Sequence, residues 1–192
     1  FSNYGIILKN HGNLDEARIS YSKAIQLQPN FAEAYSNLGI VLSDLGKREE
    51  AEKSQRKAIE LNPNLAVAHY NLGIILKDLG NLKEAEKSQR KAIKIEPNFA
   101  EAYSNLGNIF YELGELEEAE IAQRKAIRIK PDLVMAHSNL AGILKDLGNL
   151  KEAEKSQRKA IQIKPDLAMA HSNLGTILIE QGKLKEAEIS IR

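Results

Sequence analysis

The stretch AEAYSNLGIVLSDLGKREEAEKSQRKAIELNPNL, residues Ala32–Leu65, is the unit from which the rest of this chain is built. Variants of it follow one another along a sequence of 192 residues. The prolines fall at one constant interval, at Pro29, Pro63, Pro97, Pro131 and Pro165. Six glycines keep the same step: Gly12, Gly46, Gly80, Gly114, Gly148 and Gly182. A fixed period of this length predicts a repeat array, in which each unit packs on its neighbours and no single central core forms.

Alignment on the prolines divides the chain into six units of one array. The first unit lacks its opening three residues and the last stops about nine residues short, so we expect the natural protein to continue at both ends. The units are residues 1–31, 32–65, 66–99, 100–133, 134–167 and 168–192. Two segments, Leu76–Ile93 and Leu144–Ile161, are identical in sequence, which indicates recent duplication.

Each unit is predicted to form two helices joined by a tight turn. Gly46 is expected to end the first helix, because glycine tolerates the left-handed conformation common at a helix C-terminus. The second helix should run from about Lys47 to Leu61, since Pro63 prevents its continuation. Asn30 is predicted to cap the first helix, with Glu33 completing a capping box. The corresponding caps are Asn64, Asn98, Asp132 and Asp166.

The helices carry apolar faces with the spacing of a buried helix surface. On the first helix they are Tyr35, Leu38, Leu42 and Leu45, at i, i+3, i+7 and i+10. Gly39 stands beside this face, where the missing side chain lets a neighbouring helix approach. Ala51 and Ala58 give the second helix the same capacity for close packing.

These residues carry a family resemblance. The pattern Tyr35-x2-Leu38-Gly39-x2-Leu42, followed by Ala51, Ala58 and Pro63, resembles the tetratricopeptide repeat. That repeat has a period of about 34 residues, which is the interval between the prolines here. The resemblance covers the whole chain. It implies an all-α fold, a right-handed superhelical solenoid of helix-turn-helix repeats whose first helices line a concave groove.

This sequence departs from the family pattern at three places. The first large aromatic is replaced by His69, His137 and His171, and Ala141 replaces the glycine once. A bulky residue is expected between the two alanines, and Tyr21 supplies it in the first unit only. The next four units carry Gln55, Gln89, Gln123 and Gln157. A buried amide without a partner costs about 1–3 kcal/mol, so we expect these glutamines to be partly exposed or bonded to a neighbouring helix.

Composition excludes several classes of protein. The net charge is +1, whereas nucleic-acid binders carry a strong basic excess, so no nucleic-acid partner is expected. No apolar run approaches the roughly 20 residues that span a bilayer, no signal peptide is visible at Phe1, and a cytoplasmic location is expected. With no cysteine, disulfides and thiolate metal sites are excluded.

No constellation typical of an enzyme is present. The three histidines are predicted to be packing residues on neighbouring helices about 10 Å apart, too far to share a metal ion. Adjacent carboxylates such as Glu49 and Glu50 point to different sides of a helix. Phosphate-binding glycine loops, dinucleotide fingerprints and nucleophile elbows are missing. We therefore predict a non-enzymatic protein without metal or cofactor.

A column of asparagines is the candidate binding site. One occurs in every unit: Asn3, Asn37, Asn71, Asn105, Asn139 and Asn173. Each lies one residue before the residue expected on the apolar face, which is Tyr4 after Asn3 and a leucine elsewhere, and so points about 100° away from that face. The resemblance places this column in the groove, similar to asparagines of the superhelical arm of O-linked N-acetylglucosamine transferases that hold extended peptide backbone. An amide supplies both donor and acceptor to a peptide unit. Alternatively, these asparagines bond the adjacent helix and serve stacking.

Acidic residues flank the asparagines near the end of each first helix. They are Asp44, Asp78, Glu112, Asp146 and Glu180, with Asn10 in the first unit. If this acidic file lines the groove, basic or neutral extended peptides are the expected ligands. The lysine and arginine clamp with which some family members hold a terminal carboxylate is missing, since Glu33, Val67, Glu101, Met135 and Met169 occupy its positions.

The sequence therefore predicts a protein-interaction scaffold that binds an extended peptide or a partner helix through the asparagine column. The alternative is a substrate-recruiting arm of a larger enzyme, such as a glycosyltransferase or sulfotransferase. Sequence-specific RNA binding is disfavoured by the acidic file. The unfinished helix in residues 168–192 predicts weak end-to-end self-association.

Overall fold

The computed structural model describes residues 1–191, and within them it is built of α-helices without a strand. The predicted all-α fold class is confirmed, while Arg192 of the predicted sixth repeat lies outside the described residues. The helices are α1 (Ser2–Asn10), α2 (Leu14–Leu27), α3 (Ala32–Asp44), α4 (Arg48–Leu61), α5 (Ala66–Asp78), α6 (Leu82–Ile95), α7 (Ala100–Leu113), α8 (Leu116–Ile129), α9 (Val134–Asp146), α10 (Leu150–Ile163), α11 (Ala168–Glu180) and α12 (Leu184–Ile191).

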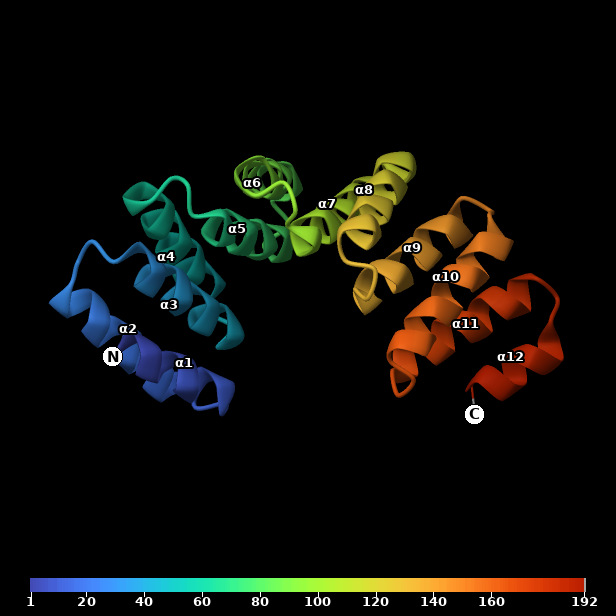
Figure 1. Ribbon diagram of the computed structural model, residues 1–192, viewed down its shortest axis with the longest axis horizontal. Helices are drawn as coiled ribbons and strands as arrows, with labels where there is room; N and C mark the ends of the chain where they lie inside the picture. Colours follow the sequence, from blue (N-terminus) through green and yellow to red (C-terminus); the bar gives the residue numbers. More distant parts are fainter. Residues whose placement is uncertain (192) are drawn as a thin grey trace. The chain divides into compact units, whose positions relative to one another are not determined.

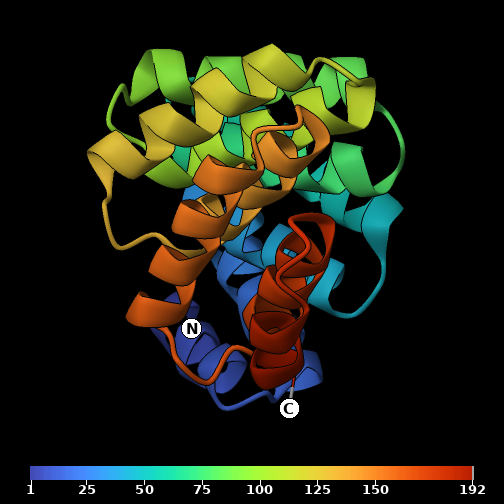
Figure 2. The same ribbon diagram turned by 90° about the vertical axis from the view of Figure 1, so that its right-hand side faces the viewer.

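The helices form antiparallel pairs, each with a first helix of odd number and a second helix of even number (Figures 1 and 2). The chain divides into two compact units of three pairs each. One unit is Phe1–Pro97 and holds α1 to α6, and the other begins at Asn98 and holds α7 to α12. The division falls in a turn between two pairs, so no helix is interrupted.

The first helices form the inner side of each unit. In the first unit α1 approaches α3 and α3 approaches α5, and in the second α7 approaches α9 and α9 approaches α11. Within either unit, as far as the structure describes it, second helices of neighbouring pairs do not come equally close. Each unit therefore curves with its first helices inside and its second helices outside.

A glycine turn joins the two helices of each pair, as the sequence predicts. Gly46 has φ +76°, and the five other periodic glycines lie in the same left-handed region. The amide of Gly46 donates to Ser43 O at 2.9 Å, and that of Lys47 donates to Leu42 O at 2.8 Å. These two bonds are the Schellman arrangement, which satisfies carbonyls left free at a helix end. The glycine is needed here because other residues rarely adopt this conformation.

The predicted N-caps are wrong. The cap of α3 is Phe31 and no side chain bonds to its first amides, so Asn30 and Glu33 form no capping box. The same holds where Asn64, Asn98, Asp132 and Asp166 were expected to cap. Pro29 and Asn30 instead occupy the centre of a turn, closed by the Phe31 amide on Gln28 O at 3.2 Å. Proline fixes the first central residue of such a turn and asparagine suits the second, so the pair ends one helix before the next begins.

The glutamines expected to be partly exposed are fully buried, although the predicted bond to a neighbouring helix is confirmed. Gln55 and Gln89 are 0% exposed, and the Gln55 side-chain amide donates to Ser36 O at 2.8 Å. Each amide lies against the glycine of the facing first helix. A Cβ built on Gly39 would stand only 2.6 Å from Gln55 Nε2. The glycine therefore leaves the space in which the amide reaches the backbone.

The fifth pair shows what happens when this glycine is absent. Ala141 stands in its place, and the Gln157 amide donates to Ala170 O of the next pair at 3.0 Å. The serine hydroxyl of Ser138 still donates to Gln157 Oε1 at 3.3 Å. In the first pair Tyr21 replaces the glutamine and packs on Gly5, whose added Cβ would meet the ring at 2.8 Å. The hydrogen-bond partner of the glutamine amide therefore changes where alanine replaces the glycine, and the space beside the glycine also accepts a tyrosine ring.

Ion pairs join the second helices to the next pair. In three of the second helices an arginine bonds two glutamates. One lies four residues earlier in the same helix, and the other lies near the start of the next second helix. Arg56 reaches Glu84 at 2.7 Å, Arg124 reaches Glu152 at 2.7 Å and Arg158 reaches Glu186 at 2.9 Å. The mostly exposed setting makes each pair worth about 0–1 kcal/mol, so they set register more than stability.

We expect Gly39→Ala to destabilise the protein by about 1–3 kcal/mol, because the new methyl group displaces a buried, bonded amide. Gly142→Ala is the matched control, since nothing lies within 4 Å of its added Cβ. This control should be stabilised by up to about 1 kcal/mol through helix propensity. Urea unfolding followed by circular dichroism measures both, and equal shifts would contradict the role of the glycine contact.

The contact between the last two helix pairs should be sensitive to acid, because it includes the ion pair of Glu154 with Lys183. Lys183 at 2.7 Å, aided by Arg158, holds the pKa of this carboxyl down to about 2 from 4.5. A folded-state pKa below the unfolded value stabilises the fold above pH 4.5, and this contribution is lost as the pH falls towards 2. In Glu154→Gln we therefore expect reduced stability at neutral pH and a difference from the native chain that disappears over this range. Glu120→Gln, one pair earlier and bonded to Arg124, is the control and should show a smaller difference in urea unfolding.

Candidate functional site

The predicted asparagines all lie on first helices, and the structure places three of them in each unit. Asn71 is buried, while Asn37, Asn105 and Asn139 are half-buried. Asn3 and Asn173 are exposed. All six therefore belong to the helices that form the inner side of each unit.

Two asparagines bond the preceding pair. Asn71 Nδ2 donates to the hydroxyl of Ser36, and Asn173 Nδ2 donates to that of Ser138, both at 3.5 Å. The second bond extends inwards, since Ser138 donates to the buried Gln157. These contacts are the stacking role that was the alternative for the column. The serine bonds hold the Nδ2 atoms of Asn71 and Asn173, and the side-chain carbonyl oxygens take no part in these bonds.

The acidic file ends the first helices. Asp44, Asp78, Asp146 and Glu180 are each the last residue of their helix, and Glu112 stands one residue before the end of α7. A carboxylate at this end faces the negative pole of the helix dipole, which costs about 0.3–1 kcal/mol at an exposed position. The arrangement is therefore unfavourable for the helices themselves.

In the second unit part of the file is bonded. Tyr111 of α7 donates its hydroxyl to Asp146 of α9, and Lys145 lies 3.0 Å from the same carboxylate. The Tyr111 bond lowers the pKa of the Asp146 carboxyl, Lys145 lowers it further, and the pKa of the Tyr111 hydroxyl is raised. Lys145 also lies 3.6 Å from Glu180 of α11. These side chains form one network across three first helices.

Exposed apolar side chains accompany the asparagines. Met135 and Met169 are 46% and 49% exposed, and each precedes an asparagine of the column by one helical turn. This spacing puts them on the same helix face as Asn139 and Asn173. In the sequence these positions only excluded a carboxylate clamp, and neither methionine was among the predicted site residues. Their i, i+4 spacing to the asparagines was the signal that could have included them.

The three histidines in the aromatic position hold the turn before their helix. The ring nitrogen Nε2 donates to the carbonyl of the proline in that turn, at 3.0 Å from His69 to Pro63 and 2.9 Å from His137 to Pro131. His171 makes the same bond to Pro165. Burial lowers the pKa of His69. The three histidines therefore act as packing residues that also hold the turn between one helix pair and the next.

Neither a metal-binding cluster nor a membrane-spanning helix is found in the described part of the chain. No group of three or more histidine, cysteine, aspartate or glutamate side chains there is arranged to hold an ion. None of its helices combines the length and apolar character needed to cross a bilayer.

Family models match most of the sequence. A model described as TPR repeat matches residues 5–46. Models described as tetratricopeptide repeat match residues 30–98, 64–132 and 136–167. Among curated protein sequences, none matches this chain significantly.

Solved structures share the fold. The chain is similar to MamA, with 28% identity, a TM-score of 0.73, and coverage of 86% of this chain and 96% of the other. It is similar to pilF of Pseudomonas aeruginosa with a TM-score of 0.88 at 18% identity, covering 99% and 86% of the two chains. YrrB, described as carrying an unusual peptide-binding site, is 24% identical with a TM-score of 0.69 and coverage of 88% of both chains.

Asp44→Asn should raise the free energy of unfolding by about 0.3–1 kcal/mol at low ionic strength, because it removes a charge that opposes the dipole of α3. In the described chain no hydrogen bond or ion pair offsets that charge. Asp146→Asn is the control, since its carboxylate is held by Tyr111 and Lys145 and its loss should bring no gain. Urea unfolding of both variants measures the difference, and an equal gain would refute this account of the file.

Proposed function

Because this chain belongs to the tetratricopeptide repeat family, we propose that it is a protein-interaction scaffold whose first helices bind an extended peptide. The observation that carries the proposal is the asparagine column, one amide per helix pair on the inner side of each unit. A peptide presents donors and acceptors at regular intervals, and an amide can bond either. YrrB, which shares the fold, is described as having a peptide-binding site.

The serine bonds support this use of the column. Ser36 and Ser138 hold the donor ends of Asn71 and Asn173, so these side chains are positioned before a ligand arrives. Ordering a side chain on binding costs about 0.5–1.5 kcal/mol, and a positioned amide avoids part of this cost. Stacking and peptide contact are therefore compatible, because the carbonyl oxygen remains available to accept from a peptide N–H.

The neighbouring side chains indicate the ligand's character. The acidic file Asp44, Asp78, Glu112, Asp146 and Glu180 attracts positive charge, and the exposed Met135 and Met169 offer apolar contact next to the column. Methionine side chains adapt to ligands of different shape. We infer a preference for basic or neutral segments with some apolar side chains. The same binding surface would serve a separate scaffold or the recruiting arm of an enzyme.

A peptide-array assay tests the proposal with Asn37, Asn105 and Asn139 all changed to Ala. These half-buried asparagines carry little structural load, and losing three hydrogen bonds of about 0.5–1.5 kcal/mol each should weaken binding at least about tenfold. The matched control changes Asn30, Asn64 and Asn98 to Ala, which are exposed turn residues. Both variants should stay helical by circular dichroism.

Equal binding by the native chain and the column variant would sink the proposal and leave the asparagines with stacking alone. Binding lost in both triple variants would point to a general effect on the fold rather than to the column. Failure of the native chain to bind any peptide would favour a role as a spacer.

A further inference from the structure

The second unit has two neighbouring hollows on its outer side, away from the asparagine column. One of about 780 Å³ lies between α8, α9 and α10, and another of about 570 Å³ lies between α10, α11 and α12. Arg158 and Gln162 of α10 line both. The hollows open because second helices stand apart while a first helix passes beneath them.

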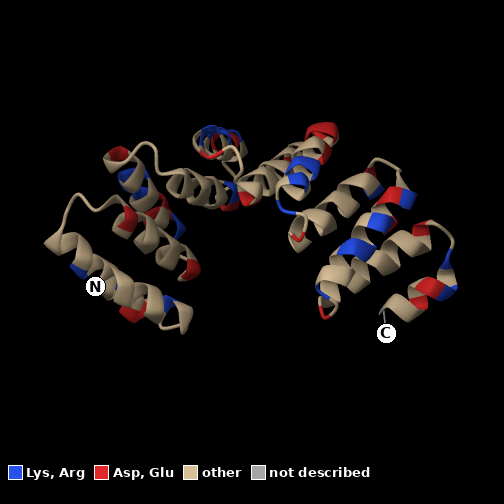
Figure 3. Cartoon of the chain, viewed as in Figure 1, with Lys and Arg blue, Asp and Glu red and all other residues tan. Residues whose placement is uncertain are grey.

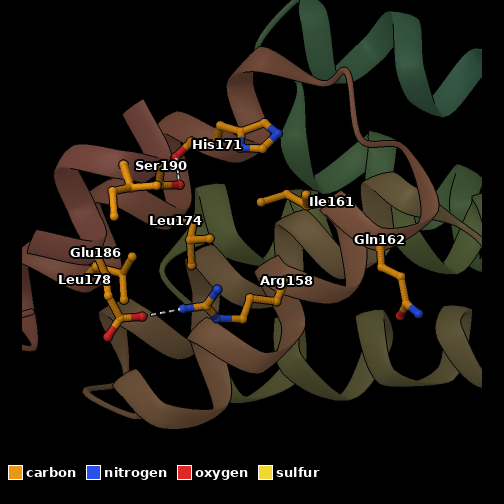
Figure 4. A pocket seen from close by; sticks show the side chains of 9 residues that line it. Arg158, Ile161, Gln162, His171, Leu174, Leu178, Glu186 and Ser190 are labelled. Carbon is orange, nitrogen blue, oxygen red and sulfur yellow. Dashed lines mark hydrogen bonds and ion pairs between the residues drawn. The ribbon is translucent and has the colours of Figure 1, made fainter. Parts of the chain in front are cut away.

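The floor of each hollow is apolar. Leu140 is 3% exposed and lies under the larger hollow with the half-buried Ile127. Figure 4 shows the smaller hollow, with Leu174 at its centre and the Arg158–Glu186 pair at one edge. Pockets of about 300–1,000 Å³ with apolar linings are typical of ligand sites. Each hollow is large enough to take a leucine or phenylalanine side chain.

Part of the positive charge on the rim of the larger hollow is not paired with a carboxylate. Arg124 is already paired with Glu120 and Glu152. Lys159 donates only to the neutral amide oxygen of Gln162, at 3.0 Å. Arg128 and Lys155 are exposed and meet no carboxylate within the described chain. Basic residues along α10 are visible in Figure 3.

The corresponding positions of the first unit differ at two residues. The identical segments supply Lys87 and Lys91 there, as they supply Lys155 and Lys159 in the second unit. However, Glu60 stands where the second unit has Arg128, and it binds Lys57 at 2.7 Å. Lys94 stands where the second unit has Gln162. At the position of Arg128, a guanidinium without a carboxylate partner in the described chain, the first unit therefore carries a carboxylate.

We propose that the larger outer hollow binds an acidic segment of a partner protein. An apolar side chain of that segment lies on Ile127 and Leu140, and flanking carboxylates bond Arg128, Lys155 and Lys159. The cations are spread over two helices, which matches successive carboxylates of a chain better than one compact anion. Arginine suits this partner because its planar group can bond both carboxylate oxygens. The apolar atoms lie at the bottom of a hollow, which a protruding side chain reaches and a flat bilayer does not.

Fluorescence anisotropy with labelled synthetic peptides tests the proposal on the full chain. Three peptides of equal length are compared: one of glutamate with leucine, one of glutamate with serine, and one of lysine with leucine. We expect the glutamate–leucine peptide to bind best, and more weakly as salt is raised. Arg128→Glu, which introduces the residue type found at the corresponding position Glu60, should weaken binding at least about tenfold by adding repulsion. Arg128→Gln should weaken it less.

Two controls separate this site from general charge and from the inner side. Lys151→Glu makes the same charge change on α10 outside the hollow and should leave affinity within about twofold. The Asn105→Ala, Asn139→Ala variant should bind the acidic peptide as the native chain does. Absence of binding, equal weakening by Lys151→Glu, or equal binding of the serine peptide would overturn the proposal. So would stronger, Arg128-dependent binding to vesicles of anionic phospholipid, which would assign the hollow to a membrane surface.

Discussion

The contact between a buried glutamine amide and a glycine on the facing helix sets the spacing of the helices in the middle pairs. Gln55 can be 0% exposed because Gly39 has no side chain and the Ser36 carbonyl accepts its amide. This bond satisfies the donor side of the desolvated amide, whose Oε1 has no hydrogen-bond partner, and it holds the two helices together. Where Ala141 fills the glycine position, the amide bonds the next pair instead. The stacking of first helices, and hence the inner side of each unit, depends on this spacing.

Much of the fold could be predicted because its signals are local and periodic. The turn at Gly46 needs one residue type at one place, and the sequence repeats it in every pair. The N-caps failed because Asn30 after Pro29 satisfies two local rules, and only the position of the next helix decides between a cap and a turn. The bond of the glutamines to a neighbouring helix was predicted, but their full burial was not, because the space beside Gly39 exists only after the two helices pack.

For the candidate site, the sequence could place each asparagine on a helix, but it could not show the side-chain contacts. The asparagine column follows from the constant repeat period and the geometry of a helix. The bond from Asn71 to Ser36 crosses from one pair to the next, and no sequence pattern marks these two positions as hydrogen-bonded. The outer hollows depend on how far α8 and α10 stand apart, which is a property of packing. Their charge became meaningful only once the paired Arg124 could be separated from the unpaired Arg128.

The identical segments that form most of α6 and α10 also affect how the array can change over generations. They are offset from each other by two complete repeat periods. Recombination between the matching stretches of the gene would remove or add two helix pairs without creating a new sequence at the junction. Every glycine turn and every glutamine contact would stay in register. Such a deletion would nevertheless remove Arg128. The shortened protein would keep its architecture and the acidic ends of its first helices, but it would lose the basic rim of the larger outer hollow.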